Sequence, residues 1–220
     1  MCFCVKNLIK QTEPDMATLG RSELVKYMQI PQLKERLVVT PILEQSQVGD
    51  ASIDIRVGND FVIARKGHLP SIDPARRGSW LKQYQYHHHV NVGEKFVLHP
   101  GQLVLASTLE YLRLPSTLAA TVTSRSKWGR AGLVIATATA IHPGFGGTIT
   151  LEMVNLGEVP LIIYPGLRVA QVVFTKCEGG TEYDGDYCGQ TEPNFQTMEG
   201  NQKENLEFWV PNADGDGPEN

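Results

Sequence analysis

The sequence lacks the features that mark several large classes of protein. No apolar run among its 220 residues approaches the roughly 18 residues of a membrane helix. The opening segment, MCFCVKNLIK, has no charged region followed by a long apolar run, so we expect no signal peptide. Lys and Arg (20) do not outnumber Asp and Glu (24), and the net charge of −4 argues against binding along a nucleic-acid backbone. We expect a cytoplasmic protein with no membrane or nucleic-acid partner.

Cysteine is scarce as well. The four cysteines do not form the disulfide framework of a small secreted domain. They include no C-x-x-C and lie near no histidine pair, so their spacing does not suit zinc. We interpret them as reduced thiols, with a redox or metal role of the C-x-C at residues 2–4 as the alternative. They are Cys2, Cys4, Cys177 and Cys188.

The composition fits one domain with appended ends. The apolar fraction of 41% allows a sizeable core. Residues 1–20 show no clear period, and the chain after residue 176 is rich in Gly, Asp, Glu and Asn. We divide the chain into an N-terminal extension (1–20), a β domain (21–176) and a C-terminal flap and tail (177–220).

Helical signals occur only near the N-terminus. Ser22 is placed to cap a short helix, and Pro31 would end it. Leu33 and Leu37 fit a second helical turn. The apolar face of the first helix would consist of Leu24, Val25 and Met28.

The remainder of the domain has the texture of β structure. The segment ASIDIRVGNDFVIAR alternates apolar and polar residues, which predicts a half-buried strand. Between residues 95 and 175, short apolar runs are separated by Pro-Gly pairs at 100–101, 143–144 and 165–166, which predicts a β-sandwich or barrel. Residues 68–93, with the run His87-His88-His89, are interpreted as a solvated loop, and a metal site at this run is the alternative.

Three segments could carry chemistry. Residues 124–132, SRSKWGRAG, combine cations, hydroxyls and glycines that suit an anion cradle, or a basic surface turn. In residues 140–152, a glycine-rich hairpin would lead into a strand that places Glu152 between threonines, where partial burial would raise its pKa for general acid/base work; a solvent-facing glutamate is the alternative. Residues 183–190, YDGDYCGQ, suit a flap that closes on a ligand, or a disordered tail.

Six segments in this order resemble the dCTP deaminase family, over about residues 22–193. SRSKWGRAGL resembles the family's R-S-S-x-x-R-x-G-L loop, and IHPGFGGTITLEMVN resembles I-D-P-G-[FW]-x-G-x-I-x-L-E-x-x-N. GDYCGQ resembles the closing G-K-Y-x-x-Q flap. The other three matching segments are VGDASIDIRVGNDF, FVLHPGQLVLASTLEYLRLP and PLIIYPGLRVAQVVF.

The resemblance implies a fold, an assembly and a reaction. The fold would be mainly β, a distorted jelly-roll or β-barrel of the dUTPase-like type with short N-terminal helices. The assembly would be a homotrimer whose active sites are built from adjoining chains. The family hydrolyses the 4-amino group of dCTP to give dUTP and ammonia without zinc, and Mg²⁺ enters on the triphosphate. We take dCTP as the substrate and dTTP as a candidate inhibitor. No residue pattern in the sequence indicates the regulation by dTTP.

The resemblance also implies roles for individual residues. Glu152 would be the general acid/base, with Ser126 and Arg130 holding the water and stabilising developing charge. Arg125, Lys127 and Gln190 would contact phosphates, and the backbone around Thr150 and Leu151 would contact the base edge. The other substrate-binding candidates are Trp128, Gly129, His142, Tyr183 and Tyr187.

Four positions depart from the family pattern. His142 replaces the aspartate that faces the deoxyribose, and Asp186 replaces a flap lysine. Lys127 replaces a serine, and Trp128 replaces an aliphatic residue. These changes leave two alternatives to a deaminase that stops at dUTP. One is a dUTPase-type pyrophosphatase, alone or combined with deamination; the other is a non-catalytic nucleotide-binding trimer.

Overall fold

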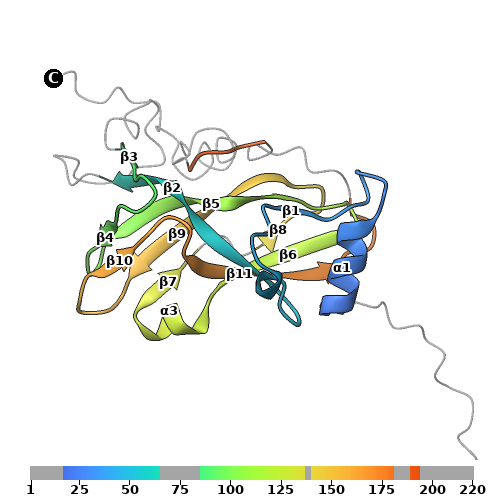
Figure 1. Cartoon of the computed structure of the whole chain (residues 1–220), viewed down its shortest axis with the longest axis horizontal. Helices are drawn as coiled ribbons and strands as arrows, with labels where there is room; N and C mark the ends of the chain where they lie inside the picture. Colours follow the sequence, from blue (N-terminus) through green and yellow to red (C-terminus); the bar gives the residue numbers. More distant parts are fainter. Residues whose placement is uncertain (1–16, 65–84, 137–139, 181–188, 194–220) are drawn as a thin grey trace, which may run out of the picture.

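The strands form one curled antiparallel sheet and a small two-stranded sheet within the described part of the chain (Figure 1). The structure is a computed structural model that describes residues 17–64, 85–136, 140–180 and 189–193. The main sheet has the order β7-β9-β5-β2-β11-β6-β8, with β1 added to β5 and β3 added to β2, and β10 pairs with β4. The elements are α1 (Arg21–Gln29), β1 (Val38–Thr40), η1 (Gln45–Gln47), β2 (Ile53–Ala64), β3 (Gln85–His89), β4 (Phe96–Leu98), β5 (Leu103–Arg113), β6 (Leu118–Ser124), α3 (Ser126–Arg130), β7 (Leu133–Ile135), β8 (Ala140–Ile141), β9 (Gly146–Asn155), β10 (Leu161–Ile163) and β11 (Arg168–Lys176).

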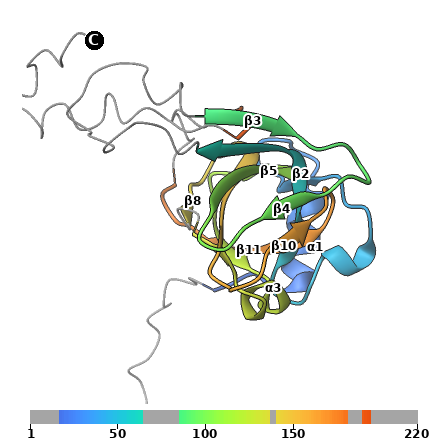
Figure 2. The ribbon, with the colours of Figure 1, turned by 90° about the vertical axis from the view of Figure 1, so that its left-hand side faces the viewer.

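Strand β2 forms the corner of the sheet. Its first residues pair with β11, and its later residues pair with β5 and β3. Register shifts interrupt the β2–β5 ladder between Val57 and Phe61 and the β5–β9 ladder between Ser107 and Tyr111. Because bulges bend and twist a sheet, these interruptions let the strands curl round a common apolar interior (Figure 2).

The three Pro-Gly pairs form turns of one kind, as the sequence predicts. In each, the residue after glycine donates its N–H to the carbonyl of the residue before proline, at 3.1, 3.2 and 3.1 Å. Gly101, Gly144 and Gly166 have φ of 68°, 79° and 87°. Proline followed by a residue with positive φ is the chemistry of a type II turn. These turns reverse the chain at fixed points and so help to set the strand boundaries.

The N-terminal helix differs in detail from its prediction. The N-cap of α1 is Gly20, without a side-chain cap, and Ser22 lies inside the first turn. Helix α1 ends at Gln29, before Pro31, as expected. Leu33 lies in a turn and Leu37 lies directly before β1, so neither belongs to a second helical turn; Leu33 is 55% exposed and Leu37 is buried. The packed part of the chain begins before Arg21, because Leu19 is buried and donates its N–H to the Phe174 carbonyl at 2.9 Å.

Two other expectations are corrected. The histidine run lies in β3, an edge strand paired with β2, and not in a loop (Figure 2). The run has no apolar alternation of its own, and its strand form depends on the long partner β2. The chain between Ile141 and Gly146 is not a hairpin, because β8 pairs with β6 whereas β9 pairs with β5 and β7. It connects two distant parts of the sheet.

Candidate active site

Strand β9 presents two chemically different faces. Ile149, Leu151 and Met153 are buried in the core, whereas Thr148, Thr150 and Glu152 are half-buried on the opposite face, as the alternation predicts. On that face Glu152 lies in a cross-strand row whose members come from four neighbouring strands. The row is His87, Val62, Leu105 and Glu152.

The surroundings of Glu152 change its acidity. Leu105 lies directly opposite it and is only 5% exposed. Desolvation by burial raises the pKa of Glu152 above its ordinary value, because the charged form loses hydration. A carboxyl with a raised pKa holds a proton more readily than an ordinary carboxyl, which suits a group that both accepts and returns a proton.

Other segments pair with the edge of β9 that faces away from β5, both before and after Thr150 along the strand. At one side, the Gly189 N–H donates to the Gly146 carbonyl at 2.6 Å, and the Thr148 N–H donates to the Gln190 carbonyl at 2.9 Å. At the other side, the Ala136 N–H donates to the Glu152 carbonyl at 2.8 Å. Since backbone groups of alternate strand residues point to the same edge, the N–H and C=O of Thr150 face this edge between the two contacts, and they have no hydrogen-bond partner among the described residues. We call this stretch of the edge the Thr150 notch.

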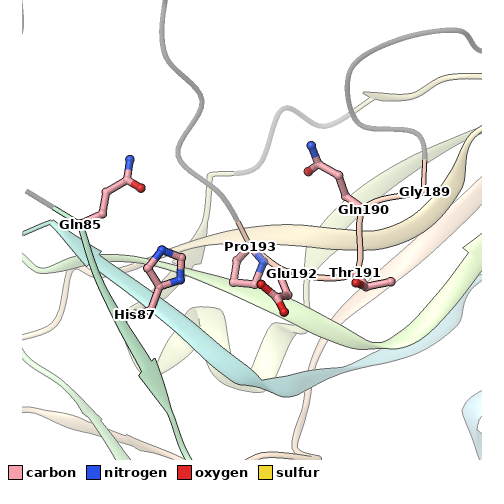
Figure 3. Close-up of a pocket in the computed structure, with 7 residues that line it drawn as sticks. All are labelled: Gln85, His87, Gly189, Gln190, Thr191, Glu192 and Pro193. Carbon is pink, nitrogen blue, oxygen red and sulfur yellow. The ribbon is translucent and has the colours of Figure 1, made fainter. Parts of the chain in front are cut away.

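A hollow of about 500 Å³ lies on the same side of the sheet. Figure 3 shows Gln85 and His87 of β3 on one side of it and residues 189–193 on the other. His87 and Glu152 are three strand spacings apart, roughly 14 Å. Glu152, rather than the hollow, is the stronger candidate for an active site, because it combines a raised pKa with the neighbouring Thr150 notch.

The basic segment forms a short helix, α3, against β7 (Figure 1). Within the described residues, the side chains of Ser126, Lys127 and Arg130 are exposed and form no hydrogen bond or ion pair. Trp128 instead packs against the core and donates its Nε1–H to the Arg168 carbonyl at 3.0 Å. The tryptophan therefore anchors α3 and leaves the polar side chains of the helix available to a ligand.

The buried side chain of Asn155, whose role sequence reasoning missed, fixes the far end of the site. Its Nδ2 donates to the carbonyls of Leu98 and Val159, and its Oδ1 accepts from the Gly157 N–H at 2.9 Å. Gly132, with φ of 98°, lies so close that an added Cβ would be 2.6 Å from the Gly157 nitrogen. The motif L-E-x-x-N, which spaces Glu152 and Asn155, was the sequence signal that could have indicated this role of Asn155. The Asn155 side chain therefore couples the end of β9 to the loop after α3.

Comparisons with known proteins give this arrangement a family. The family model described as "dCTP deaminase-like" matches residues 20–177. The chain belongs to the dCTP deaminase-like family. A protein of Methanosphaera stadtmanae named "dCTP deaminase, dUMP-forming" is 37% identical, over 81% of this chain and 92% of its own. A protein of Halorubrum lacusprofundi named "dCTP deaminase" is 39% identical, over 71% of this chain and 81% of its own.

The fold of this dCTP deaminase-like chain is also found among solved structures. The crystal structure of a 2′-deoxycytidine 5′-triphosphate deaminase from Agrobacterium tumefaciens matches with a TM-score of 0.57 and 22% identity. The match covers 74% of this chain and 49% of that chain. The predicted fold class, mainly β with a barrel-like curled sheet, is confirmed.

The predicted site residues of the dCTP deaminase-like chain fall into three groups. Glu152, Thr150 and Gln190 gather along β9, with Leu151 turned to the core. The residues of the basic segment gather at α3, and His142 is exposed in the turn before β9. Tyr183, Asp186 and Tyr187 lie outside the described residues.

Among the described residues, no group of three or more His, Cys, Asp or Glu is placed to hold a metal ion. No helix in the described ranges is long and apolar enough to cross a membrane.

Proposed function

We propose that the protein hydrolyses dCTP to dUTP and ammonia at Glu152. The observation that carries this proposal is a carboxyl with raised pKa beside the Thr150 notch. A peptide N–H and C=O side by side can hydrogen-bond the edge of a pyrimidine, which would bring C4 of the ring within reach of the carboxyl. The names of the relatives from M. stadtmanae and H. lacusprofundi support the same substrate.

The proposed reaction needs one group that moves protons. As water adds to C4 of cytosine, the Glu152 carboxylate accepts one of its protons and passes it to ring N3. Glu152 then takes the remaining proton from the C4 hydroxyl and gives it to the exocyclic amine, so the C4–N bond breaks, the C4 carbonyl forms, and ammonia leaves the uracil nucleotide. A carboxyl with raised pKa suits both directions of transfer. We assign Ser126 to holding the water and Arg130 to stabilising the developing negative charge.

The remaining site residues would hold the nucleotide. Arg125, Lys127 and Gln190 are proposed to contact phosphates, with the Gly129 backbone beside them. Mg²⁺ would enter on the triphosphate and be held mainly by phosphate oxygens and water. His142 and Trp128 would lie near the sugar, and Tyr183 and Tyr187 in the flap. We propose a cytoplasmic location, and dTTP as a candidate inhibitor.

We further propose a homotrimer with sites shared between adjoining chains. The exposed side chains of Ser126 and Arg130 have no partner among the described residues, which suits groups that face a neighbouring chain. Leu103, Val154 and Val134 also form an apolar row across β5, β9 and β7 on the face that carries Glu152. Leu103 is 41% exposed and Val134 is 37% exposed, so a second copy could cover this row.

The product distinguishes this proposal from a second candidate. His142 stands where the family pattern has an aspartate, and an imidazole, which carries no negative charge, is a poor substitute for an anionic group that orients water. We therefore expect the reaction to stop at dUTP. The relative from M. stadtmanae is named as dUMP-forming, which favours the bifunctional alternative.

Incubation with dCTP and Mg²⁺, and separately with dUTP and Mg²⁺, tests the function. We expect ammonia and dUTP from dCTP, and no pyrophosphate from either nucleotide. Anion-exchange chromatography and ammonium detection would measure both. Appearance of dUMP and pyrophosphate as the first products would favour the bifunctional enzyme. Binding of dCTP without any product would favour the non-catalytic trimer.

A further inference from the structure

The carboxylate of Asp54 lies between two arginines that approach α3. Asp54 Oδ1 is 3.2 Å from Arg125 Nε, and Asp54 Oδ2 is 3.5 Å from Arg168 Nη1. The Asp54 side chain is 14% exposed, Arg125 33% and Arg168 28%. Each carboxylate oxygen thus serves a different guanidinium, in a partly desolvated setting where charge-assisted hydrogen bonds are stronger than on an open surface.

A bulge in β11 provides further contacts for the same loop. The β11–β2 register shifts between Arg168 and Ala170, which frees backbone groups from the ladder. The Arg168 carbonyl accepts from Trp128 Nε1 at 3.0 Å and Arg125 Nη1 at 3.5 Å. The Val169 carbonyl accepts from the Arg125 N–H at 3.0 Å. The start of α3 is therefore fastened to the bulge by backbone and side-chain contacts.

The Arg168 side chain has two further partners, Ser46 and Glu44. Its Nη1 donates to Ser46 Oγ at 3.2 Å, and its Nη2 lies 3.8 Å from Glu44 Oε2. These contacts hold Arg168 in place, and Arg168 in turn contacts Asp54 and the loop at the start of α3.

We propose that Asp54 is a positioning residue for α3, the helix that carries Ser126 and Arg130. By accepting from Arg125 and Arg168 together, it sets the direction of the Arg125 guanidinium and the start of the helix. A guanidinium has five N–H donors, and the contacts with Asp54 and the Arg168 carbonyl use two of them. The other donors have no partner among the described residues, so they can bind phosphate in a fixed orientation. The catalytic part of this inference rests on the proposed function.

Asp54→Asn is the sharpest single change. Asparagine keeps the size but has one acceptor oxygen, so it can serve only one of the two arginines. We expect kcat/KM for dCTP to fall by roughly 10- to 100-fold, since small misplacements of catalytic groups have effects of this size. Amide hydrogen exchange at residues 128–132 should accelerate in the protein without nucleotide. Asp54→Glu, which keeps both oxygens, should recover part of the loss.

A double-mutant cycle separates positioning from general destabilisation. Arg125→Lys keeps the charge but loses the planar fork that reaches both Asp54 and the Arg168 carbonyl. If Asp54 acts through Arg125, Asp54→Asn should cost less than about three-fold in kcat/KM in the Arg125→Lys background. Glu35→Gln removes an exposed carboxylate that forms no ion pair with Arg125 or Arg168, and should change kcat/KM by less than about two-fold.

The outcomes for the inference and for the proposed function differ. An equal loss of kcat/KM from Asp54→Asn in both backgrounds would overturn the positioning role, as would unchanged exchange at residues 128–132. Wild-type protein that does not convert dCTP would overturn the proposed function instead. The exchange measurement on the free protein would still decide whether Asp54 orders α3.

Discussion

Glu152 and Glu44 start with the same intrinsic acidity and are driven in opposite directions by their neighbours. Burial beside Leu105 raises the pKa of Glu152. A hydrogen bond from Ser46 and the charge of Arg168 lower the pKa of Glu44. The first carboxyl is suited to carry a proton and the second to remain ionised. Local neighbours, rather than residue type, decide which acidic residue can do the chemistry.

Glu152→Gln should abolish most of the deamination. Glutamine keeps the size and hydrogen-bonding capacity but cannot carry the proton, so we expect kcat to fall by about 10²- to 10⁴-fold. Nucleotide affinity should be largely kept, because the phosphate contacts lie elsewhere. Steady-state kinetics and dCTP binding would measure both, with the exposed Glu158→Gln as the matched control. A Gln variant within a few-fold of wild type would exclude Glu152 as the catalytic residue.

The same variant should also change the pH dependence of stability. The pKa of Glu152 is higher in the folded than in the unfolded chain, so the folded protein binds more protons between the two values, and stability falls as pH rises through this window. The contribution is fully present below the ordinary pKa of 4.5 and is lost above the raised pKa. The Tm of Glu152→Gln relative to wild type should therefore increase from about pH 4 to about pH 8. A constant difference would contradict the raised pKa.

At the scale of elements, the sequence predicts features that depend on neighbouring residues, but it does not predict the pairings between segments that are distant in the chain. The Pro-Gly turns and the alternation of β9 depend on neighbouring residues, so the sequence could place them. The strand character of His87-His88-His89 depends on β2, a partner distant in the sequence. The same is true of the contact between Gly189–Gln190 and β9, and of the bulge at Arg168 that anchors α3. The catalytic candidates were identifiable by motif, whereas Asp54 and Asn155 acquire their roles only through long-range packing.

The contact between residues 189–190 and β9 yields a test at this scale. An added Cβ at Gly147 would lie 2.9 Å from the Gln190 carbonyl oxygen, so Gly147→Ala should displace that segment. Loss of one hydrogen bond, about 1 kcal/mol, would raise KM for dCTP by roughly five-fold. Kinetics and hydrogen exchange at Thr148 would measure the effect. Gly166→Ala is the control, because Gly166 has φ of 87° but nothing within 4 Å of the added Cβ. Equal KM values for the two variants would refute the docking role.

At the scale of the whole molecule, the proposed catalytic groups lie on surfaces that one chain leaves open. Ser126 and Arg130 project from α3, and the apolar row of Leu103, Val154 and Val134 adjoins Glu152. An assembly that buries this row would also exclude water from the neighbouring carboxyl, which strengthens its electrostatic interactions. Oligomerisation and catalysis should therefore depend on the same face.

Light scattering should report a trimer of about 73 kDa, three chains of 24.3 kDa. Val134→Glu would place a charge in the apolar row and should yield smaller species with little deaminase activity. Val92→Glu, at a site 85% exposed in the turn before β4, should leave the trimer and the activity intact. A stable wild-type monomer at micromolar concentration would count decisively against the assembly.

The central position of β2 has a consequence for synthesis. Its first residues pair with β11, so β2 leaves the ribosome long before this partner exists. Strand β6 pairs with the other edge of β11, so it also lacks this partner until β11 has been synthesised. Both keep an open edge until Lys176 has emerged, and open apolar edges are where nascent chains associate wrongly. A chain terminated before β11 would lack the strand that joins β2 to β6 as well as the segment that closes on β9. A prematurely terminated chain should therefore be degraded by proteases, and it should retain no partial activity.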